Sequence, residues 1–99
     1  MAVNNMRPIH PGEILRKEYL EPLGMSPNAL SIHLRVPAPR VNEVVRERRA
    51  VTTDTALRLA RYFNTTAQYW LNLQTSYDLK LAEREVGNKI ENEIQPLAA

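Results

Sequence analysis

The chain has 99 residues, a net charge of +2 and no cysteine. This length favours one compact domain, and a hydrophobic fraction of 43% is enough to form its core. The lack of cysteine excludes disulfides and thiolate metal sites, and two histidines are too few for a histidine-based metal site, so we expect no metal and no cofactor. No apolar run approaches the roughly 20 residues that cross a membrane, and residues 1–7 lack the apolar centre of a signal peptide, so a cytoplasmic protein is expected.

Positive charge is concentrated in the middle of the chain. Residues 35–61 hold seven basic side chains, all of them arginine, and three acidic ones, whereas residues 62–99 carry a net charge of −2. Arginine is suited to forked contacts with phosphates and guanine edges. The middle segment is therefore expected to face an anionic partner, and the rest of the surface a different one.

The apolar spacing predicts five helices, and no stretch alternates over the length of a strand. The first helix is predicted to begin at Pro11 with His10 as its cap, and Pro22 and Gly24 are predicted to end it. The other predicted helices cover residues 27–34, 38–46, 53–63 and 66–86. They form one domain over residues 10–86, between an N-terminal extension at 1–9 and a flexible tail at 87–99.

The fifth predicted helix carries two apolar stripes. One consists of Trp70, Leu73 and Tyr77, and the other of Leu71, Thr75, Leu79, Ala82 and Val86. A helix needs only one stripe to pack on its own core, so the second predicts contact with the same helix of another subunit. The alternative is a helix in a deep groove, with both stripes facing one core. Trp70 is expected in the core or the dimer interface, although an aromatic side chain can also stack on single-stranded bases.

Residues 27–34 and 38–46 match a helix-turn-helix, in which the second helix lies in the DNA major groove. The outer face of that second helix carries Arg40, Asn42, Glu43 and Arg46, types suited to guanine, adenine and cytosine edges. Arg48 and Arg49 follow in the connection to the next helix, where a phosphate strand would pass. The competing interpretation is a charged face that only contacts water.

From His10 to Asp78 the chain resembles the HigA-type antitoxins, a branch of the Xre family of phage-repressor-like helix-turn-helix proteins. The resemblance rests on residues 10–15 (HPGEIL), 20–26 (LEPLGMS), 40–46 (RVNEVVR), 53–63 (TDTALRLARYF), 69–74 (YWLNLQ) and 77–79 (YDL). It implies a five-helix fold like that of the lambda repressor, dimeric through the C-terminal helix. It also implies a repressor that binds a palindromic operator and neutralises a HigB-type toxin, a small ribosome-dependent mRNA endonuclease.

Carried over position by position, the family's base-reading sites fall on Ala38, Pro39, Arg40 and Glu43. Its contacts with the DNA backbone fall on Arg46, Arg48, Arg49 and the helix cap at Thr52 and Thr53. Asn42 is expected either to help in base reading or to brace Arg40. The sequence departs from the repressor pattern in three places, since Arg35 and Glu47 stand where glycine is common and Pro27 replaces a glutamine. Ser26 and Asn28 are the substitutes for the lost glutamine contact.

Two alternative functions remain open at the level of the sequence. One is a toxin inhibitor with little DNA binding, in which the toxin docks on the edge of the first helix formed by Arg16, Lys17, Glu18 and Glu21. The other is an Xre-type transcriptional repressor with no toxin partner. An enzyme is not expected, because the chain shows neither a glycine-rich phosphate loop nor metal-ligand spacing.

Overall fold

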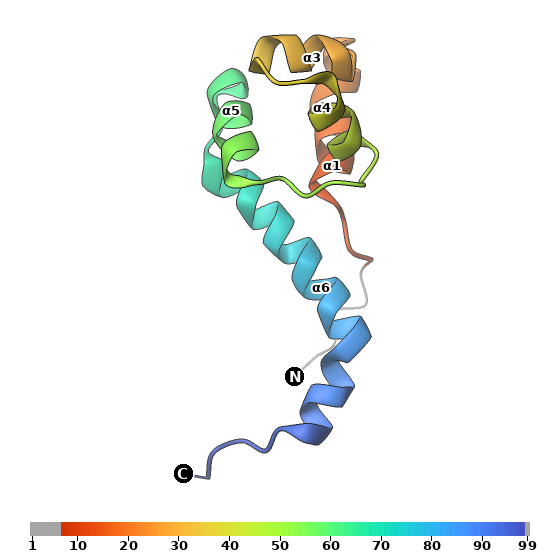
Figure 1. Cartoon of the computed structure of the whole chain (residues 1–99), viewed down its shortest axis with the longest axis vertical. Helices are drawn as coiled ribbons and strands as arrows, with labels where there is room; N and C mark the ends of the chain where they lie inside the picture. The colour runs from red at the N-terminus through yellow and green to blue at the C-terminus, as the bar shows by residue number, and fades with distance from the viewer. Residues whose placement is uncertain (1–6, 99) are drawn as a thin grey trace.

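A computed structural model describes residues 7–98, and over this range the protein is helical and has no strand. The first helix consists of three consecutive segments, α1 (Pro11–Ile14), η1 (Leu15–Leu20) and α2 (Glu21–Leu23). It is followed by α3 (Pro27–Leu34), α4 (Ala38–Val45), α5 (Thr53–Phe63) and α6 (Ala67–Glu93). The helices up to α5 form a globular head, and α6 extends away from it toward the C-terminus (Figure 1). The predicted all-α, five-helix architecture is thus confirmed for the described residues, whereas residues 1–6 of the predicted extension lie outside them.

The first helix contains a wider, π-helical turn, η1, in which hydrogen bonds join residues five positions apart. The Glu21 N–H, for example, donates to the Arg16 carbonyl. Pro22 accounts for this turn, because in an α-helix its ring would collide with the carbonyl four residues earlier. Of the two residues predicted to end the helix, Pro22 lies inside it, and only Gly24 ends it. Gly24 has a φ of 61° and donates its N–H to the Glu21 carbonyl at 3.1 Å.

Three helices end on a residue in the left-handed conformation that is not glycine. These are Arg35 (φ 58°) after α3, Glu47 (φ 63°) beyond α4, and Asn64 (φ 57°) after α5. In each case the next N–H donates to the carbonyl five residues earlier, at 3.1, 2.8 and 3.0 Å. These bonds satisfy carbonyls at the helix end and offset the roughly 1 kcal/mol cost of the left-handed conformation. The missing glycines at 35 and 47 therefore leave the helix-turn-helix intact.

The core lies inside the head, where all the larger helices meet. Its most deeply buried side chains include Leu15 from η1, Leu30, Val41 and Val44 from α3 and α4, Leu59 from α5 and Trp70 from α6. Trp70 donates its indole N–H to Thr65 Oγ1 at 2.9 Å and contacts the ring of Tyr19. Trp70 is thus a core residue of the head, and no face of its ring is free to stack on a base.

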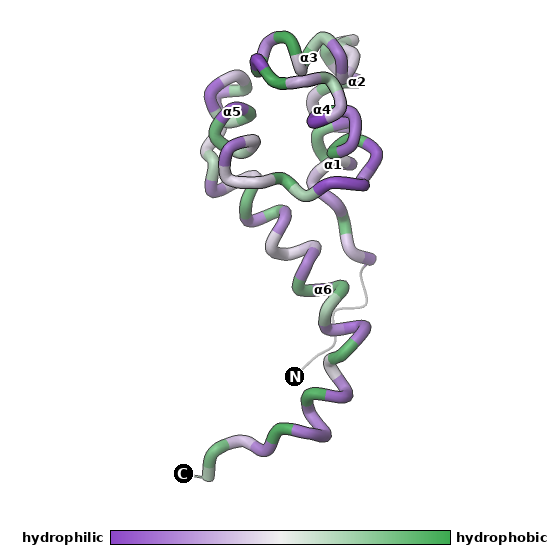
Figure 2. The backbone as a smooth tube through the Cα atoms, in the orientation of Figure 1, coloured by the Kyte–Doolittle hydropathy of each residue, from purple (hydrophilic) through white to green (hydrophobic). Residues whose placement is uncertain are grey.

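Beyond the head, α6 exposes a long apolar stripe. Apolar and polar residues alternate along its whole length (Figure 2), and the exposed large apolar side chains are Leu79, Val86 and Ile90 on α6 and Ile94 directly after it. The helix continues past its predicted end at Val86 to Glu93, with Gly87 inside it and with Lys89 4.0 Å from Glu93. Residues 87–93 of the predicted flexible tail are therefore helical. None of the helices between residues 7 and 98 is long and apolar enough to cross a membrane.

Candidate nucleic-acid interface

The two helices α3 and α4 form a helix-turn-helix over the predicted residues. The buried side chains of Leu30, Leu34, Val41 and Val44 pack in the core below them. On the outer side, Asn42 of α4 donates its side-chain amide to Asn28 Oδ1 of α3 at 2.7 Å. This bond joins the start of the first helix of the motif to the middle of the second.

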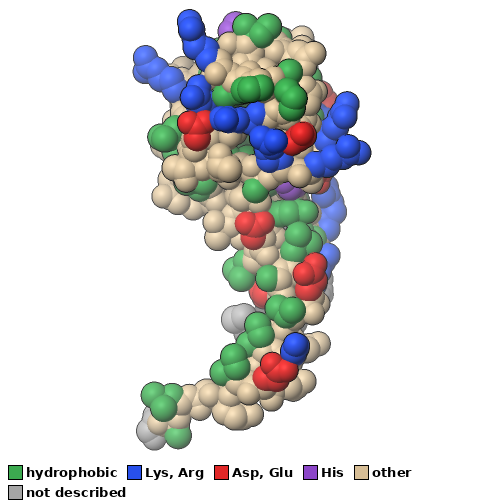
Figure 3. Space-filling model, viewed as in Figure 1, with side chains coloured by type: hydrophobic (Ala, Val, Ile, Leu, Met, Phe, Trp, Pro, Cys, Tyr) green, Lys and Arg blue, Asp and Glu red, His purple; other side chains and the backbone are tan. Residues whose placement is uncertain are grey.

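The residues predicted to contact DNA lie on one stretch of the head surface, and none of them is buried. They come from the start of α3, from α4, from the α4–α5 connection and from the first turn of α5: Ser26, Asn28, Ala38, Pro39, Arg40, Asn42, Glu43, Arg46, Arg48, Arg49 and Thr53. Figure 3 shows arginine and lysine side chains gathered on the head, with acidic side chains set between them. Among the described residues, the side chains of Arg46 and Arg48 have no hydrogen-bond or ion-pair partner.

Arg40, the main predicted base reader, is held by a partner that the sequence did not suggest. Its Nη1 donates to Oδ2 of Asp54, in the first turn of α5. The same oxygen accepts from Arg58 Nε at 2.9 Å, and Arg58 Nη1 donates to the Leu34 carbonyl at 2.8 Å. The hydrogen bond from Arg58, followed by that from Arg40, lowers the pKa of Asp54 below its usual value. The carboxylate is therefore ionised at neutral pH.

The other polar side chains of α4 are also engaged. Asn42 donates to the Ala38 carbonyl at 2.9 Å as well as to Asn28 Oδ1, so of its two predicted roles the structure does not favour the bracing of Arg40, and base reading stays a prediction. Glu43 accepts from Arg49 at 2.8 Å. Sequence spacing could not have shown the Asn42–Asn28 pair, because it joins two helices and depends on how they cross.

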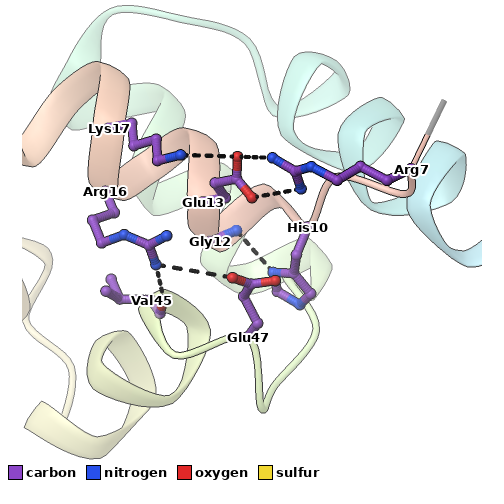
Figure 4. A network of polar contacts seen from close by, with 8 residues as sticks. All are labelled: Arg7, His10, Gly12, Glu13, Arg16, Lys17, Val45 and Glu47. Atoms are coloured by element: carbon purple, nitrogen blue, oxygen red, sulfur yellow. Dashed lines mark hydrogen bonds and ion pairs between the residues drawn. The ribbon is translucent and has the colours of Figure 1, made fainter.

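The back of α4 rests on the first helix (Figure 4). Gly12 lies so close that a Cβ atom there would stand 1.8 Å from the Val44 carbonyl oxygen. Arg16 donates to the Val45 carbonyl at 2.9 Å, and its Nη1 lies 3.9 Å from a carboxylate oxygen of Glu47. Arg16 thus satisfies a carbonyl at the C-terminal end of α4. Of the edge predicted to dock a toxin, only Lys17, Glu18 and Glu21 are exposed, since Arg16 is half-buried against α4.

The N-terminus of the first helix is capped as predicted. His10 Nδ1 accepts the Gly12 N–H at 2.8 Å, and its ring meets that of Tyr77 on α6 edge-on, with centroids 4.8 Å apart. Burial lowers the pKa of His10, which favours the neutral imidazole that this cap requires. His10 is therefore a structural residue, and residues 7–98 contain no group of three or more side chains suited to hold a metal.

The stripe predicted as a dimer interface is divided by the structure. Leu71 is half-buried and packs against the core of its own head. Thr75, Leu79, Ala82 and Val86 are exposed further along α6. The two predicted stripes therefore do not face one core, because only Leu71 of the second stripe packs against the head.

No family model matches this chain, but individual relatives are similar to it. Virulence-associated protein I of Dichelobacter nodosus is 61% identical over 82 residues, which are 83% of this chain and 76% of that protein. The Pseudomonas aeruginosa antitoxin HigA, solved with the higBA promoter, has a TM-score of 0.91 and 54% identity, covering 93% of this chain and 100% of that one. An addiction module antidote protein of a HigA family from Coxiella burnetii has a TM-score of 0.89 and 51% identity, with the same coverage. At this level of identity and coverage, the chain belongs to the HigA family of helix-turn-helix antitoxins.

Proposed function

We propose that the protein is a cytoplasmic antitoxin that binds a palindromic operator as a homodimer, represses its own operon and neutralises a HigB-type mRNA endonuclease. The observation that carries the DNA-binding half is the set of non-buried arginines on α4 and the connection after it, namely Arg40, Arg46 and Arg48. The side chains of Arg46 and Arg48 have no partner among the described residues. The Pseudomonas relative was solved with the higBA promoter, which supports DNA binding as the role of this chain. The proposal assigns no catalytic step to this chain.

In the proposed complex α4 enters the major groove. Arg40 donates to a guanine edge, while Ala38 and Pro39, at the start of α4, offer only apolar contact, as to a thymine methyl group. Arg46 and Arg48 contact phosphates, which position the protein without reading sequence. Two copies of α4 would occupy successive major grooves about 34 Å apart.

The homodimer is proposed to form through α6. Thr75, Leu79, Ala82 and Val86 present an exposed surface on a helix that has left its own head. Ile90 and Ile94, also exposed, extend the apolar part of this surface toward the C-terminus. Pairing two copies would remove these apolar side chains from water, which is the main favourable term in association.

The departures at Arg35 and Glu47 do not favour the alternative of a toxin inhibitor with little DNA binding. Both residues adopt the left-handed conformation that the turns need, and α3 and α4 keep the helix-turn-helix arrangement. For the toxin we propose the exposed edge of Lys17, Glu18 and Glu21, which lies on the first helix and not on α4.

A fluorescence-anisotropy titration tests the DNA-binding half. The protein is titrated into a duplex from the promoter upstream of its own gene and into a scrambled duplex, each at two salt concentrations. We expect tight binding selective for the promoter, with a log–log salt slope that grows by about −0.9 for each phosphate neutralised. Equal, weak binding to both duplexes would mean that the arginines of the proposed interface contact only water and do not bind the operator.

Co-purification tests the toxin half. A tagged copy of this chain is expressed with the small basic nuclease encoded beside its gene, where one is present, and a stable complex is expected. Reversing the charges of Lys17, Glu18 and Glu21 together should abolish capture while leaving promoter binding intact. Continued capture by this variant would exclude the proposed edge. Absence of a neighbouring nuclease gene would favour a repressor with no toxin partner.

A further inference from the structure

The ion pair between Arg40 and Asp54 lies at the surface and contributes little to stability. The side chain of Arg40 is 31% exposed and that of Asp54 is 55% exposed. Exposed ion pairs of this kind are screened by water and salt. Stabilisation of the fold is therefore not the main effect of this pair.

The pair does fix the orientation of the arginine that the proposed function places on a base. Asp54 is itself held in place by Arg58, which reaches from α5 to the Leu34 carbonyl at the end of α3. The carboxylate also lies in the first turn of α5, where the helix dipole favours a negative charge. Arg40 is thus tied to a fixed point, and a long side chain that would otherwise sample many rotamers is restricted before DNA arrives.

The tie leaves the reading edge of Arg40 available. A guanidinium has five N–H donors, and the structure uses one nitrogen of Arg40, Nη1, for Asp54. The remaining donors are enough for the bidentate contact with guanine O6 and N7. Asp54 also places a negative charge next to the expected path of the DNA phosphates. This charge repels the phosphates and weakens binding to DNA of any sequence.

We propose that Asp54 is a positioning residue for base recognition: it aims Arg40 at one base pair and lowers the affinity for non-operator DNA. This inference rests on the proposed operator binding. It assigns specificity to a carboxylate that does not touch the base. Arg58 and the end of α3 then form the support that keeps Asp54 in place, beside an open cavity of about 370 Å³ that Asp54, Arg58 and Leu57 help to line.

The test compares Asp54→Ala with wild type on a panel of promoter duplexes, in which each base pair of one half-site is changed in turn. The variant should lose about three- to tenfold of its preference at a single base pair, the one read by Arg40, since a good bidentate contact discriminates by about five- to 150-fold and an untied Arg40 would keep part of this. Its affinity for scrambled DNA should rise about threefold at low salt, because a negative charge has been removed. Asp54→Asn removes the same charge but keeps a side-chain oxygen that can accept from Arg40, so it should raise the affinity for scrambled DNA equally and lose less of the base preference. Glu21→Ala removes an equal charge from the exposed surface of α2 and should change neither value.

An Arg40→Ala background separates positioning from a general structural role. In that background, adding Asp54→Ala should leave the base preference unchanged, because there is no longer an arginine to aim. Uniform loss of affinity with preference retained in Asp54→Ala, or a change of preference in the Arg40→Ala background, would overturn the inference. If the wild-type protein itself shows no preference for the promoter, operator binding fails as well, and this result is distinct from the other two.

Discussion

Gly12 of the first helix lies directly against the backbone of the recognition helix, so Gly12→Ala probes how α4 is held. The added Cβ would stand 1.8 Å from the Val44 carbonyl oxygen, whereas an ordinary contact begins at 3.4 Å. Val44 is buried in the core and the atom in the way belongs to the backbone, so no side-chain rotation relieves the overlap. The two helices must separate, which strains the buried contact between them. Overpacking of this kind costs about 1–3 kcal/mol, and more where the backbone must move.

The cost is measured by thermal unfolding followed by circular dichroism at one protein concentration. For a domain of this size 1 kcal/mol lowers the melting temperature by about 4–8 °C, so a fall of at least about 4 °C is expected. Gly87→Ala is the matched control, because the nearest atom to its added Cβ is 4.0 Å away and the residue lies inside α6. This control should raise stability by about 0.5–1 kcal/mol. If Gly12→Ala has the same melting temperature as the wild type, the close packing of α1 on α4 is refuted.

Three further results are expected. Glu13 of α1 accepts hydrogen bonds from Arg7 at 2.9 and 2.7 Å and one from Lys17 at 3.4 Å, and these lower the pKa of its carboxyl group to about 2. The contribution of Glu13 to stability is therefore full above the ordinary pKa of 4.5 and is lost as the pH falls from 4.5 to 2. In acid unfolding, Glu13→Gln should flatten the stability profile over this range, and an unchanged profile would contradict the assignment. In anisotropy titrations, Arg40→Ala should weaken operator binding by about 1–3 kcal/mol and relax one position, whereas Arg48→Ala should weaken binding to all duplexes alike; identical behaviour of the two variants would argue against separate roles. In sedimentation experiments, Val86→Asp should shift the protein toward monomer, because a charge would be buried in the proposed interface, and an unaltered dimer would place the interface elsewhere.

Most of the fold could be predicted because helix ends depend on local chemistry. Ser26 and Thr52 accept the backbone N–H groups of the first turns, and Asn64 takes the left-handed conformation that ends α5. The two errors have local causes too. The π-helical turn accommodates Pro22 inside the first helix. The sequence after Val86 is mostly polar and was therefore predicted as a tail, but it is helical to Glu93, with Lys89 4.0 Å from Glu93.

For the candidate site, the sequence predicted which residues share one face of a helix, but not which side chains bond to each other. The sequence by itself determined that α4 would carry Arg40, Asn42 and Glu43 on its outer side, because helical periodicity alone decides which residues share a face. Only the tertiary structure decided that Arg40 pairs with Asp54, fourteen positions away in another helix. The angle at which α4 crosses α5 brings these two side chains together. That angle is set by the packing of the whole core, so it cannot be read from Arg40 and Asp54 themselves.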